Sequence, residues 1–441
     1  MKPISRTYRS VALAASAVSL ALLATACGGG DGGSADAESG GGKPVTLTMW
    51  SWMVGQKDVV AEFNRTHKDI RIDFTEIPGG VEGYAKISGA IKGGNAPDII
   101  GMEYGRLPEF ASQGQLEDLS GPAGELVKTF PENIRSLVSP GGKTWGVPFD
   151  VTPQLLYYRT DLFEKAGVEV PATWDEFRSA AEKIKKADKK VRITNVPAGG
   201  DVPVINGLFW QAGSAAFGIE GDAWTVDVDD AAAQKAAKFF DGLVKDDLAA
   251  NLVSWSEEEG AAKKNGTIAS FIGAPWSGGG LIAQMPELKG KWATAPLPTW
   301  DGKPATGMWG GTSVAVPKGS GHVEEAVEFA EWMTTDPAAM EARLKNAEAP
   351  SSALPVKQEL QDVARTRFAE VSQGYFANDI YETAAAQIPT IVPGWTWGPV
   401  QGTVDEAFNA AVAKGGWTAG LAAAQQAAEK ALADRGLKTA E

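Results

Sequence analysis

Along the first part of the chain, hydrophobic residues follow strand-like and helix-like periods in turn. Residues 45–50 alternate between apolar and polar, which predicts a strand, and the apolar residues of 59–63 share one face of a predicted helix. Alternation returns over 70–74, and a second helical stretch leads to the apolar run 98–100. This β-α-β-α-β order predicts a parallel sheet covered by helices on both faces, and ligands of such sheets bind beyond the carboxyl ends of the strands.

A second α/β unit is predicted further along the chain. A strand over 155–157 precedes a helix that begins at the capping box formed by Thr173 and Glu176. Residues 313–316 are predicted to form another strand, and 323–333 another amphipathic helix. Together with the helical C-terminal part, these segments favour two α/β lobes of comparable size. The hydrophobic period alone does not say which lobe each late segment joins.

Composition narrows the classes of protein that fit this pattern. The 441 residues include 41 basic and 55 acidic side chains, a formal net charge of −14, with two His and one Cys. An acidic chain gives no sign of the basic stripe that binds nucleic acid, so we expect no nucleic-acid partner. With His67 and His322 as the histidines and a single cysteine, a His-rich metal site, a Cys-ligated zinc site and an internal disulfide are excluded. We therefore expect no metal and no cofactor.

The N-terminal segment 1–26 has the pattern of an export signal peptide. Lys2, Arg6 and Arg9 precede an apolar run over 11–26, which is shorter than the roughly twenty residues of a membrane-spanning helix. The run ends in small residues directly before the one cysteine of the chain. We therefore expect the mature protein to begin close to that cysteine.

The cysteine lies in the segment LATAC, which resembles a bacterial lipobox with Ala24 in place of the more usual Leu. The resemblance implies that Cys27 becomes the lipidated first residue of the mature protein. An ordinary secretory peptide followed by an unused thiol is the alternative. Because 27–43 is rich in Gly and has no apolar group to bury, it is predicted to be a flexible tether to the extracytoplasmic face of the cell membrane.

Several segments, taken in order, resemble the family 1 extracellular solute-binding proteins. These are the sugar-binding proteins of bacterial ABC importers, and they include maltose- and oligosaccharide-binding proteins. The likeness covers roughly residues 45 to 435 and lies in LTMWSW, NAPDII, LPEFASQGQLEDL, TWGVPFDVTPQLLYYRTDLFEKAGVEVPATWDEF, GTIASFIGAPW, GGTSVAVPKGSGHVEEAVEFAEWM and TVDEAFNAAVAKG. It implies a type II periplasmic-binding-protein-like α/β fold, with a ligand cleft between two lobes.

The resemblance also implies a hinge that the chain crosses more than once. We expect crossings near residues 148, 300 and 348. Lobe 1 would then comprise 44–148 and 301–348, and lobe 2 would comprise 149–300 and most of 349–441 with the C-terminal helices. A further implication is a monomer that closes around its ligand and presents it to ABC permease subunits, with no catalytic residue.

Tryptophan is abundant in this chain, with 15 Trp against 7 Tyr. One face of a pyranose ring is a patch of C–H groups that an indole face covers, while the ring hydroxyls bond to carboxylates, amides and backbone groups. The aromatic content therefore favours a sugar, and several separated Trp candidates favour an oligosaccharide over a monosaccharide. A structural role is predicted for Trp174, Trp210, Trp224, Trp332 and Trp417.

Candidate ligand contacts follow the first and third predicted strands. Trp50 and Trp52 close the first strand, with packing in the core as the alternative for one of them. Glu103 and Tyr104 follow the third strand, where a plain surface carboxylate is the alternative for Glu103. Asn206 is a further polar candidate.

Two other tryptophans stand beside glycines. Trp309 precedes Gly310 and Gly311, which would let a ligand approach the backbone closely, with a tight turn as the alternative. Trp276 precedes a glycine-rich stretch, 277–280, that we expect to be a turn exposing the ring. The family resemblance implies an aromatic platform at this position.

The resemblance implies three more contacts. Asp150 follows the GVPF segment, where the family has a polar ligand contact, and a surface carboxylate is its alternative. Trp395 and Trp397 lie in the loop PGWTWG, where the family has a stacking aromatic, and one of the two is expected to pack in the core instead.

Other functions remain open from the sequence. An anchored glycoside hydrolase with two carboxylates is one, although no G-x-S-x-G or H-E-x-x-H motif is present. The same fold with a peptide, polyamine, metal chelate or phosphate ester is another, and Arg106 is the one nearby candidate for an anion site. A receptor that signals to a membrane sensor instead of feeding a permease is a third.

Overall fold

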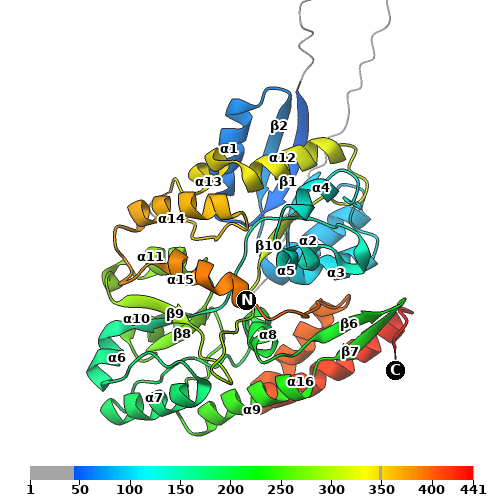
Figure 1. Cartoon of the computed structure of the whole chain (residues 1–441). Helices are drawn as coiled ribbons and strands as arrows, with labels where there is room; N and C mark the ends of the chain where they lie inside the picture. The colour runs from blue at the N-terminus through cyan, green and yellow to red at the C-terminus, as the bar shows by residue number, and fades with distance from the viewer. Residues whose placement is uncertain (1–43, 347–349, 441) are drawn as a thin grey trace, which may run out of the picture. The chain divides into compact units, whose positions relative to one another are not determined.

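The computed structural model of the protein describes residues 44–346 and 350–440 (Figure 1). The predicted signal peptide 1–26, the proposed lipidation site Cys27 and the tether 27–43 lie outside the described residues. No helix within the described ranges combines the length and the apolar character that a bilayer crossing requires.

The first sheet has five strands in the order β2-β1-β3-β10-β4. The strands are β1 Val45–Ser51, β2 Ile70–Glu76, β3 Ile99–Glu103, β4 Val147–Pro148 and β10 Thr312–Ala315. β1 pairs in parallel with β2 and β3, which confirms the predicted β-α-β-α-β unit. β10 runs antiparallel to β3 and β4, so the complete sheet is mixed and extends the predicted parallel unit by strands of both directions. β10 lies far from β3 and β4 in the sequence, and hydrophobic periodicity does not indicate the direction of a strand.

The second sheet is antiparallel, with the order β8-β5-β9. Its strands are β5 Leu155–Arg159, β8 Ser270–Gly273 and β9 Trp292–Pro296, and a separate hairpin joins β6 Ala216–Glu220 to β7 Ala223–Asp227. The strand predicted over 155–157 is confirmed. The chain passes from the first sheet to the second between β4 and β5, and it returns between β9 and β10.

Helices connect these strands and form the C-terminal part of the chain. The α-helices are α1 Gln56–Thr66, α2 Gly80–Lys92, α3 Leu107–Ser112, α4 Gly124–Lys128, α5 Glu132–Arg135, α6 Thr160–Ala166, α7 Trp174–Ala187, α8 Val202–Gln211, α9 Ala231–Lys245, α10 Glu257–Asn265, α11 Ser277–Gln284, α12 Val323–Thr335, α13 Pro337–Arg343, α14 Gln358–Ser372, α15 Ile380–Gln387 and α16 Gln401–Asp434. The short 3-10 helices are η1 Tyr104–Arg106, η2 Ser136–Val138, η3 Pro140–Gly142, η4 Pro286–Leu288 and η5 Ile388–Thr390.

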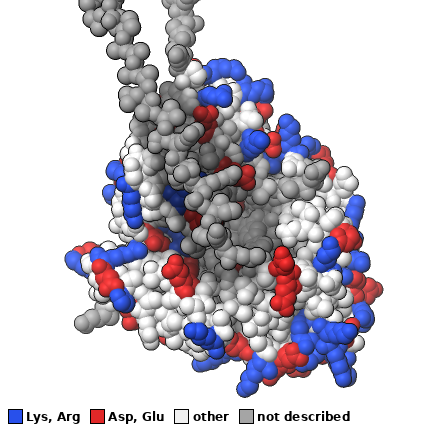
Figure 2. Space-filling view, turned by 180° about the vertical axis from the view of Figure 1, so that it is seen from behind, with Lys and Arg blue, Asp and Glu red and all other residues white. Residues whose placement is uncertain are grey.

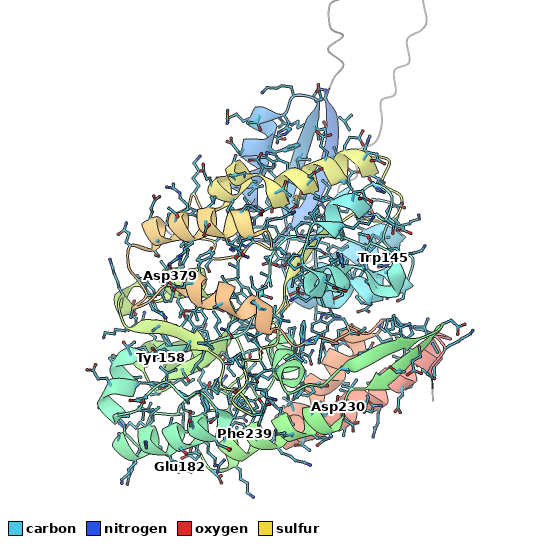
Figure 3. All side chains as sticks on the ribbon, viewed as in Figure 1. Trp145, Tyr158, Glu182, Asp230, Phe239 and Asp379 are labelled. Carbon is cyan, nitrogen blue, oxygen red and sulfur yellow. The ribbon has the colours of Figure 1, made fainter. Side chains whose placement is uncertain are left out.

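Helix α7 shows how local sequence sets an element and its packing. Its predicted capping box is present, because Thr173 Oγ1 accepts from the Glu176 amide at 3.2 Å and the Glu176 carboxylate accepts from the Thr173 amide at 3.3 Å. The indole of Trp174 is 1% exposed and lies 5.6 Å from the ring of Phe239. Phe239 belongs to α9 and is labelled in Figure 3. Trp174 is therefore part of the core, as predicted.

Among the other tryptophans with a predicted structural role, Trp210 and Trp417 are buried, whereas Trp224 and Trp332 pack against the core with part of their surface exposed. On the face seen in Figure 2, acidic and basic side chains are interspersed among the coloured residues and do not gather into a basic stripe.

Candidate functional site

Two adjoining cavities are lined by residues that follow strands of both sheets. The first has a volume of about 360 Å³ and the second of about 390 Å³. They share Glu103, Asp201 and Gly310, and together they are called the cleft. The first is lined by Trp52, Met53, Val54, Glu103, Phe149, Asp150, Asp201, Trp276, Gly279, Gly280, Ala283, Trp309, Gly310, Gly311, Thr312, Arg343 and residues 350–353. The second is lined by Gly79, Gly80, Val81, Glu103, Gly105, Arg106, residues 200–203, Trp255, Gly310, Trp397, Gln401, Asp405 and Asn409.

A larger groove of about 870 Å³ lies on the surface along α1, α13 and α14. Charged side chains such as Glu62 and Arg65 line it, and no aromatic residue does. Because Glu62 and Arg65 already form an ion pair, this groove offers less to a small ligand than the cleft does.

Strand ends of the first sheet carry one wall of the cleft. Trp52 follows β1, Glu103 ends β3 and Asp150 follows β4. β10 is antiparallel to its neighbours, so its amino end, beginning at Thr312, lies beside the carboxyl end of β3. The predicted position of the site at this edge of the sheet therefore agrees with the geometry.

Three tryptophans form an indole cluster in the cleft. The ring of Trp276, directly before α11, lies 4.5 Å from that of Trp309 at an interplanar angle of 65°. Trp255 stacks on Trp276, with ring centroids 6.0 Å apart and an angle of 27°, and lies 5.8 Å from Trp309. The Nε1 of Trp276 donates to the carbonyl oxygen of Trp309 at 3.2 Å, which fixes its ring. Such a cluster presents a wide apolar face to a ligand.

Trp52 and Tyr84 form a second aromatic group. Their rings meet edge to face, with centroids 5.5 Å apart and an angle of 78°. The hydroxyl of Tyr84 donates to Glu103 Oε2 at 2.8 Å and accepts from the Glu103 amide at 3.1 Å. Glu103 is thereby held at the point that both cavities share.

Three carboxyl groups line the first cavity. Burial raises the pKa of Glu103, that of Asp150 to about 7 and that of Asp201 to about 6. Asp150 Oδ1 accepts from the Thr312 amide at 2.6 Å, and Asp201 Oδ2 accepts from Trp255 Nε1 at 2.8 Å. Within the described residues none of the three forms an ion pair. They can therefore accept hydrogen bonds from ligand hydroxyls, and while protonated they can also donate.

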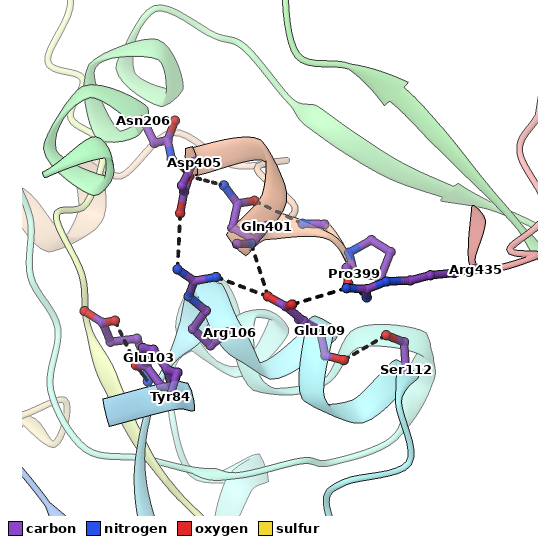
Figure 4. Close-up of polar contacts among 12 residues, drawn as sticks. Tyr84, Glu103, Arg106, Glu109, Ser112, Asn206, Pro399, Gln401, Asp405 and Arg435 are labelled. Carbon is purple, nitrogen blue, oxygen red and sulfur yellow. Dashed lines mark hydrogen bonds and ion pairs between the residues drawn. The ribbon is translucent and has the colours of Figure 1, made fainter. Parts of the chain in front are cut away.

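Arg106 lines the second cavity, but its charge is already balanced (Figure 4). Its guanidinium lies 3.1 Å from Glu109 and 3.6 Å from Asp405. Asp405 also accepts from Gln401 Nε2 at 2.8 Å and from Asn206 Nδ2 at 3.4 Å. The candidate for an anion site that the sequence suggested is therefore committed to protein carboxylates. Within the described ranges, no three His, Cys, Asp or Glu side chains are placed to hold a metal ion.

The cleft brings together most of the site residues that the sequence suggested. Those that line the first cavity are Trp52, Glu103, Asp150, Trp276, Trp309, Gly310 and Gly311. Trp397 lines the second cavity, with Glu103 and Gly310. Four predicted residues do not line either cavity, namely Trp50, Tyr104, Asn206 and Trp395.

The structure gives these four residues other partners. Tyr104 is fully buried in the core, and its hydroxyl donates to the Asp150 carbonyl oxygen at 2.8 Å. Trp395 stacks on Trp210 with centroids 5.5 Å apart and an angle of 11°. Lys86 Nζ lies 4.8 Å from the centre of the Trp50 ring. Asn206 is buried and donates to Asp405, as described above.

The glycines after Trp276 do not form the expected turn. They belong to helix α11, whose residues begin at Ser277. A Cβ at Gly279 would lie 1.9 Å from the carbonyl oxygen of Pro350, and one at Gly278 would lie 2.5 Å from Ile380 Cδ1. Gly279 therefore allows the backbone at Pro350 to approach the helix, and Gly278 allows the side chain of Ile380 to do so, which hydrophobic periodicity does not reveal.

Sequence reasoning missed Trp255 and Asp201. Trp255 lies in a loop with no periodic pattern, but a lone indole between Ser254 and Ser256, ahead of three glutamates, has no evident packing role and could have signalled a ligand contact. Asp201 directly follows Gly200 and lies at the N-cap of helix α8, where it resembles an ordinary capping residue. Its carboxylate instead binds the indole of Trp255.

Comparisons with known proteins find similar chains. A family model described as bacterial extracellular solute-binding protein matches residues 54–340. The arabinooligosaccharide-binding protein of Bacillus subtilis is 30% identical over 287 residues, which is 62% of this chain and 64% of that protein. The diacetylchitobiose binding protein DasA of Streptomyces coelicolor is 28% identical over 66% of this chain and 69% of its own. The chain thus spans less than two thirds of the first of these relatives.

Solved structures are similar over most of the chain. The galacto-N-biose-/lacto-N-biose I-binding protein of the ABC transporter from Bifidobacterium longum, in complex with lacto-N-biose, is 26% identical with a TM-score of 0.78. That match covers 90% of this chain and 99% of the other. The ABC transporter associated binding protein of B. animalis subsp. lactis, in complex with β-1,6-galactobiose, has a TM-score of 0.77 at 25% identity and covers 90% and 100%.

Proposed function

Because the chain belongs to the family of bacterial extracellular solute-binding proteins, we propose that it captures an oligosaccharide in the cleft and delivers it to the permease of an ABC importer. The predicted type II periplasmic-binding-protein-like α/β fold is confirmed by the similarity to the two sugar-bound structures. Relatives named for arabinooligosaccharide and diacetylchitobiose support a carbohydrate ligand.

The observation that carries this proposal is the pairing of the indole cluster with unpaired carboxyl groups in one cavity. A pyranose has an apolar C–H face and a rim of hydroxyls, so it needs an aromatic surface and polar acceptors together. Trp276 and Trp309 supply the first, and Glu103, Asp150 and Asp201 supply the second. Each of the two cavities falls within the roughly 300–1,000 Å³ of small-molecule sites, so their junction gives room for more than one sugar ring.

Delivery requires two states of different ligand affinity. A sugar that contacts both lobes stabilises the closed form by its greater affinity for that form, and the permease then meets a loaded protein. The division into lobes, 44–148 with 301–348 and 149–300 with 349–441, is part of this proposal. So are the lipid anchor at Cys27, the extracytoplasmic position and the monomeric state.

We assign no catalytic residue to the cleft. The carboxyl groups hold ligand hydroxyls in this proposal, and the bound sugar leaves the protein unchanged. The matching family and the solved neighbours are binding proteins, which supports this view.

A panel of di- to pentasaccharides tests the proposal. A sugar present at one hundred times its Kd should stabilise the protein by roughly 2.7 kcal/mol, which raises Tm measurably. We expect the shift to disappear in Trp276→Ala and to persist in Trp145→Ala, which removes a partly buried indole outside the cleft (Figure 3). The sugar should be recovered intact by chromatography. No stabilisation by any sugar would contradict the proposal, and cleavage of the sugar would favour a glycoside hydrolase.

A further inference from the structure

We infer that the cleft prefers oligosaccharides that carry a protonated amine, and that Trp255 with Asp201 recognises the charged unit. This inference rests on the proposed function, because it names the class of sugar that the same cleft takes. Three features of the described residues support it: the conformation of Trp255, the unpaired carboxyl groups and the arrangement of the indoles.

Trp255 has an unusual conformation for a large side chain. Its φ is 64°, in the left-handed region, and 59% of its surface is exposed. Strain of this kind in a bulky residue persists when surrounding contacts enforce it, and such residues cluster at ligand sites. Here the contacts are specific, because its amide donates to Glu259 Oε2 at 2.9 Å and its Nε1 donates to Asp201 Oδ2 at 2.8 Å. An exposed indole is thus held over the second cavity, which it lines.

Negative charge in the first cavity is only partly balanced by the protein. The buried guanidinium of Arg343 lines the same cavity, and its attraction opposes the rise in the pKa of Asp150 that burial causes, whereas Asp201 forms no ion pair within the described residues. The hydrogen-bond donors to Glu103, Asp150 and Asp201 are a phenol, an amide and an indole, all uncharged. A buried carboxylate without a cation is unfavourable, as the raised pKa values of these groups reflect. A ligand ammonium group would relieve this cost at the moment of binding.

The cations that line the cleft are already engaged. Arg106 pairs with Glu109 and Asp405. Arg343 is 2% exposed and donates to the Val54 carbonyl oxygen at 3.1 Å and to Gln56 Oε1 at 3.0 Å. Neither guanidinium forms an ion pair with a carboxyl group of the first cavity within the described residues. The acceptors of Arg343 are uncharged and its charge attracts Asp150, so Asp201 is the carboxyl group left for a ligand cation.

The indole cluster adds a second attraction for a cation. A protonated amine close to an indole face is attracted by the negative face of the ring, and the effect grows where water is excluded. Trp255, Trp276 and Trp309 surround the region next to Asp201 with three such rings. A free polyamine would use the charges but has no C–H face of a pyranose ring to cover the indoles, whereas an amino sugar has both a charge and such a face. The geometry therefore favours an amino sugar.

Three disaccharides that differ only at C2 of each ring test the inference. They are chitobiose with free amines, its N,N′-diacetyl form and cellobiose. In calorimetric titrations at pH 6.5 we expect chitobiose to bind at least roughly tenfold more tightly than cellobiose. Asp201→Asn keeps an oxygen that can accept from Trp255 Nε1 and removes the charge, so we expect it to abolish most of this preference. Asp175→Asn removes the same charge from the exposed start of α7 and should leave the preference unchanged.

The outcomes separate the inference from the proposed function. Chitobiose that binds no more tightly than cellobiose, or does not bind, overturns the inference. If chitobiose shows no preference but a neutral sugar of the panel binds, the proposed function stands and only the inference about amino sugars is withdrawn. Binding of putrescine, with no binding of chitobiose or of any sugar of the panel, overturns both.

Discussion

Tyr84 links the aromatic and the acidic sides of the cleft. Its ring lies edge-on to Trp52, and its hydroxyl donates to Glu103 at 2.8 Å. This hydrogen bond favours the ionised form of Glu103 and so opposes the rise of its pKa that burial causes. One residue thus sets both the position and the charge of a carboxyl group at the junction of the two cavities.

The substitution Tyr84→Phe is expected to weaken sugar binding without removing the ring contact to Trp52. Loss of one hydrogen bond corresponds to about 1 kcal/mol, or roughly fivefold in Kd, and the pKa of Glu103 should rise further. Calorimetric titration with the best sugar of the panel measures the effect. Tyr158→Phe, on β5 and outside the cleft, is the control and should not change Kd (Figure 3). An unaltered Kd in Tyr84→Phe would contradict the role given to this hydroxyl.

At the scale of elements, helix α11 is held against the segment that follows α13. Its Gly279 amide donates to Ser352 Oγ at 2.8 Å, and the Pro350 carbonyl oxygen occupies the place of a Cβ at Gly279. Both Gly279 and Ser352 line the first cavity. The close approach therefore shapes the cavity wall as well as the packing.

Two substitutions in α11 test this close approach. Gly279→Ala would place a Cβ 1.9 Å from a backbone oxygen and should lower the free energy of unfolding by about 1–3 kcal/mol. Gly280→Ala has its nearest atom at 3.9 Å and should leave stability unchanged or raise it by up to ~1 kcal/mol, because Ala favours the helix. Urea unfolding measures the free energy of unfolding of both variants and of the unaltered protein. Equal stability of the two would show that α11 is free to move away from Pro350.

Helices and strands with a clear hydrophobic pattern could be predicted from the sequence. The direction in which a strand pairs with its neighbours could not always be predicted. β1 and β2 alternate, β3 is a short apolar run, and the helices between them require parallel strands, so this unit is as predicted. β10 has the predicted position in sequence but the opposite direction to the predicted sheet. The direction of β10 depends on how the chain returns to the sheet, so it cannot be predicted from the residues of the strand itself.

The candidate site was predictable where side chains follow strands and not where loops meet. Trp52, Glu103 and Asp150 all lie in the cleft at strand ends. Trp395 and Trp397 are two residues apart in one loop. Both rings are buried and both contact Trp210, stacked in one case and edge to face in the other, yet of the two only Trp397 lines the second cavity. The hydrogen bond between Trp255 and Asp201 joins two segments that are distant in sequence, so no local sequence pattern predicts it.

At the scale of the whole molecule, the buried acids of the cleft make stability depend on pH. The pKa of Asp150 is raised to about 7 and that of Asp201 to about 6, from an ordinary value of 3.8. Between about pH 4 and 7 the native protein therefore binds more protons than the unfolded chain. The free energy of unfolding must then fall as pH rises through this interval, as far as these groups determine it.

Thermal unfolding without ligand tests this pH dependence. We expect Tm to fall from pH 5 to pH 7.5, and we expect a smaller fall in Asp150→Asn, which keeps an acceptor for the Thr312 amide. Asp175→Asn should retain the fall seen in the unaltered protein. A Tm of Asp150→Asn with the same pH dependence as that of the unaltered protein would contradict the assignment of this effect to the cleft.

A crystal structure with the best-bound sugar of the panel tests the central claim most directly. We expect sugar rings against the faces of Trp276 and Trp255, with hydroxyl groups on Glu103 and Asp150, inside the cleft. A sugar bound at another surface, with the cleft free of carbohydrate, would contradict the account.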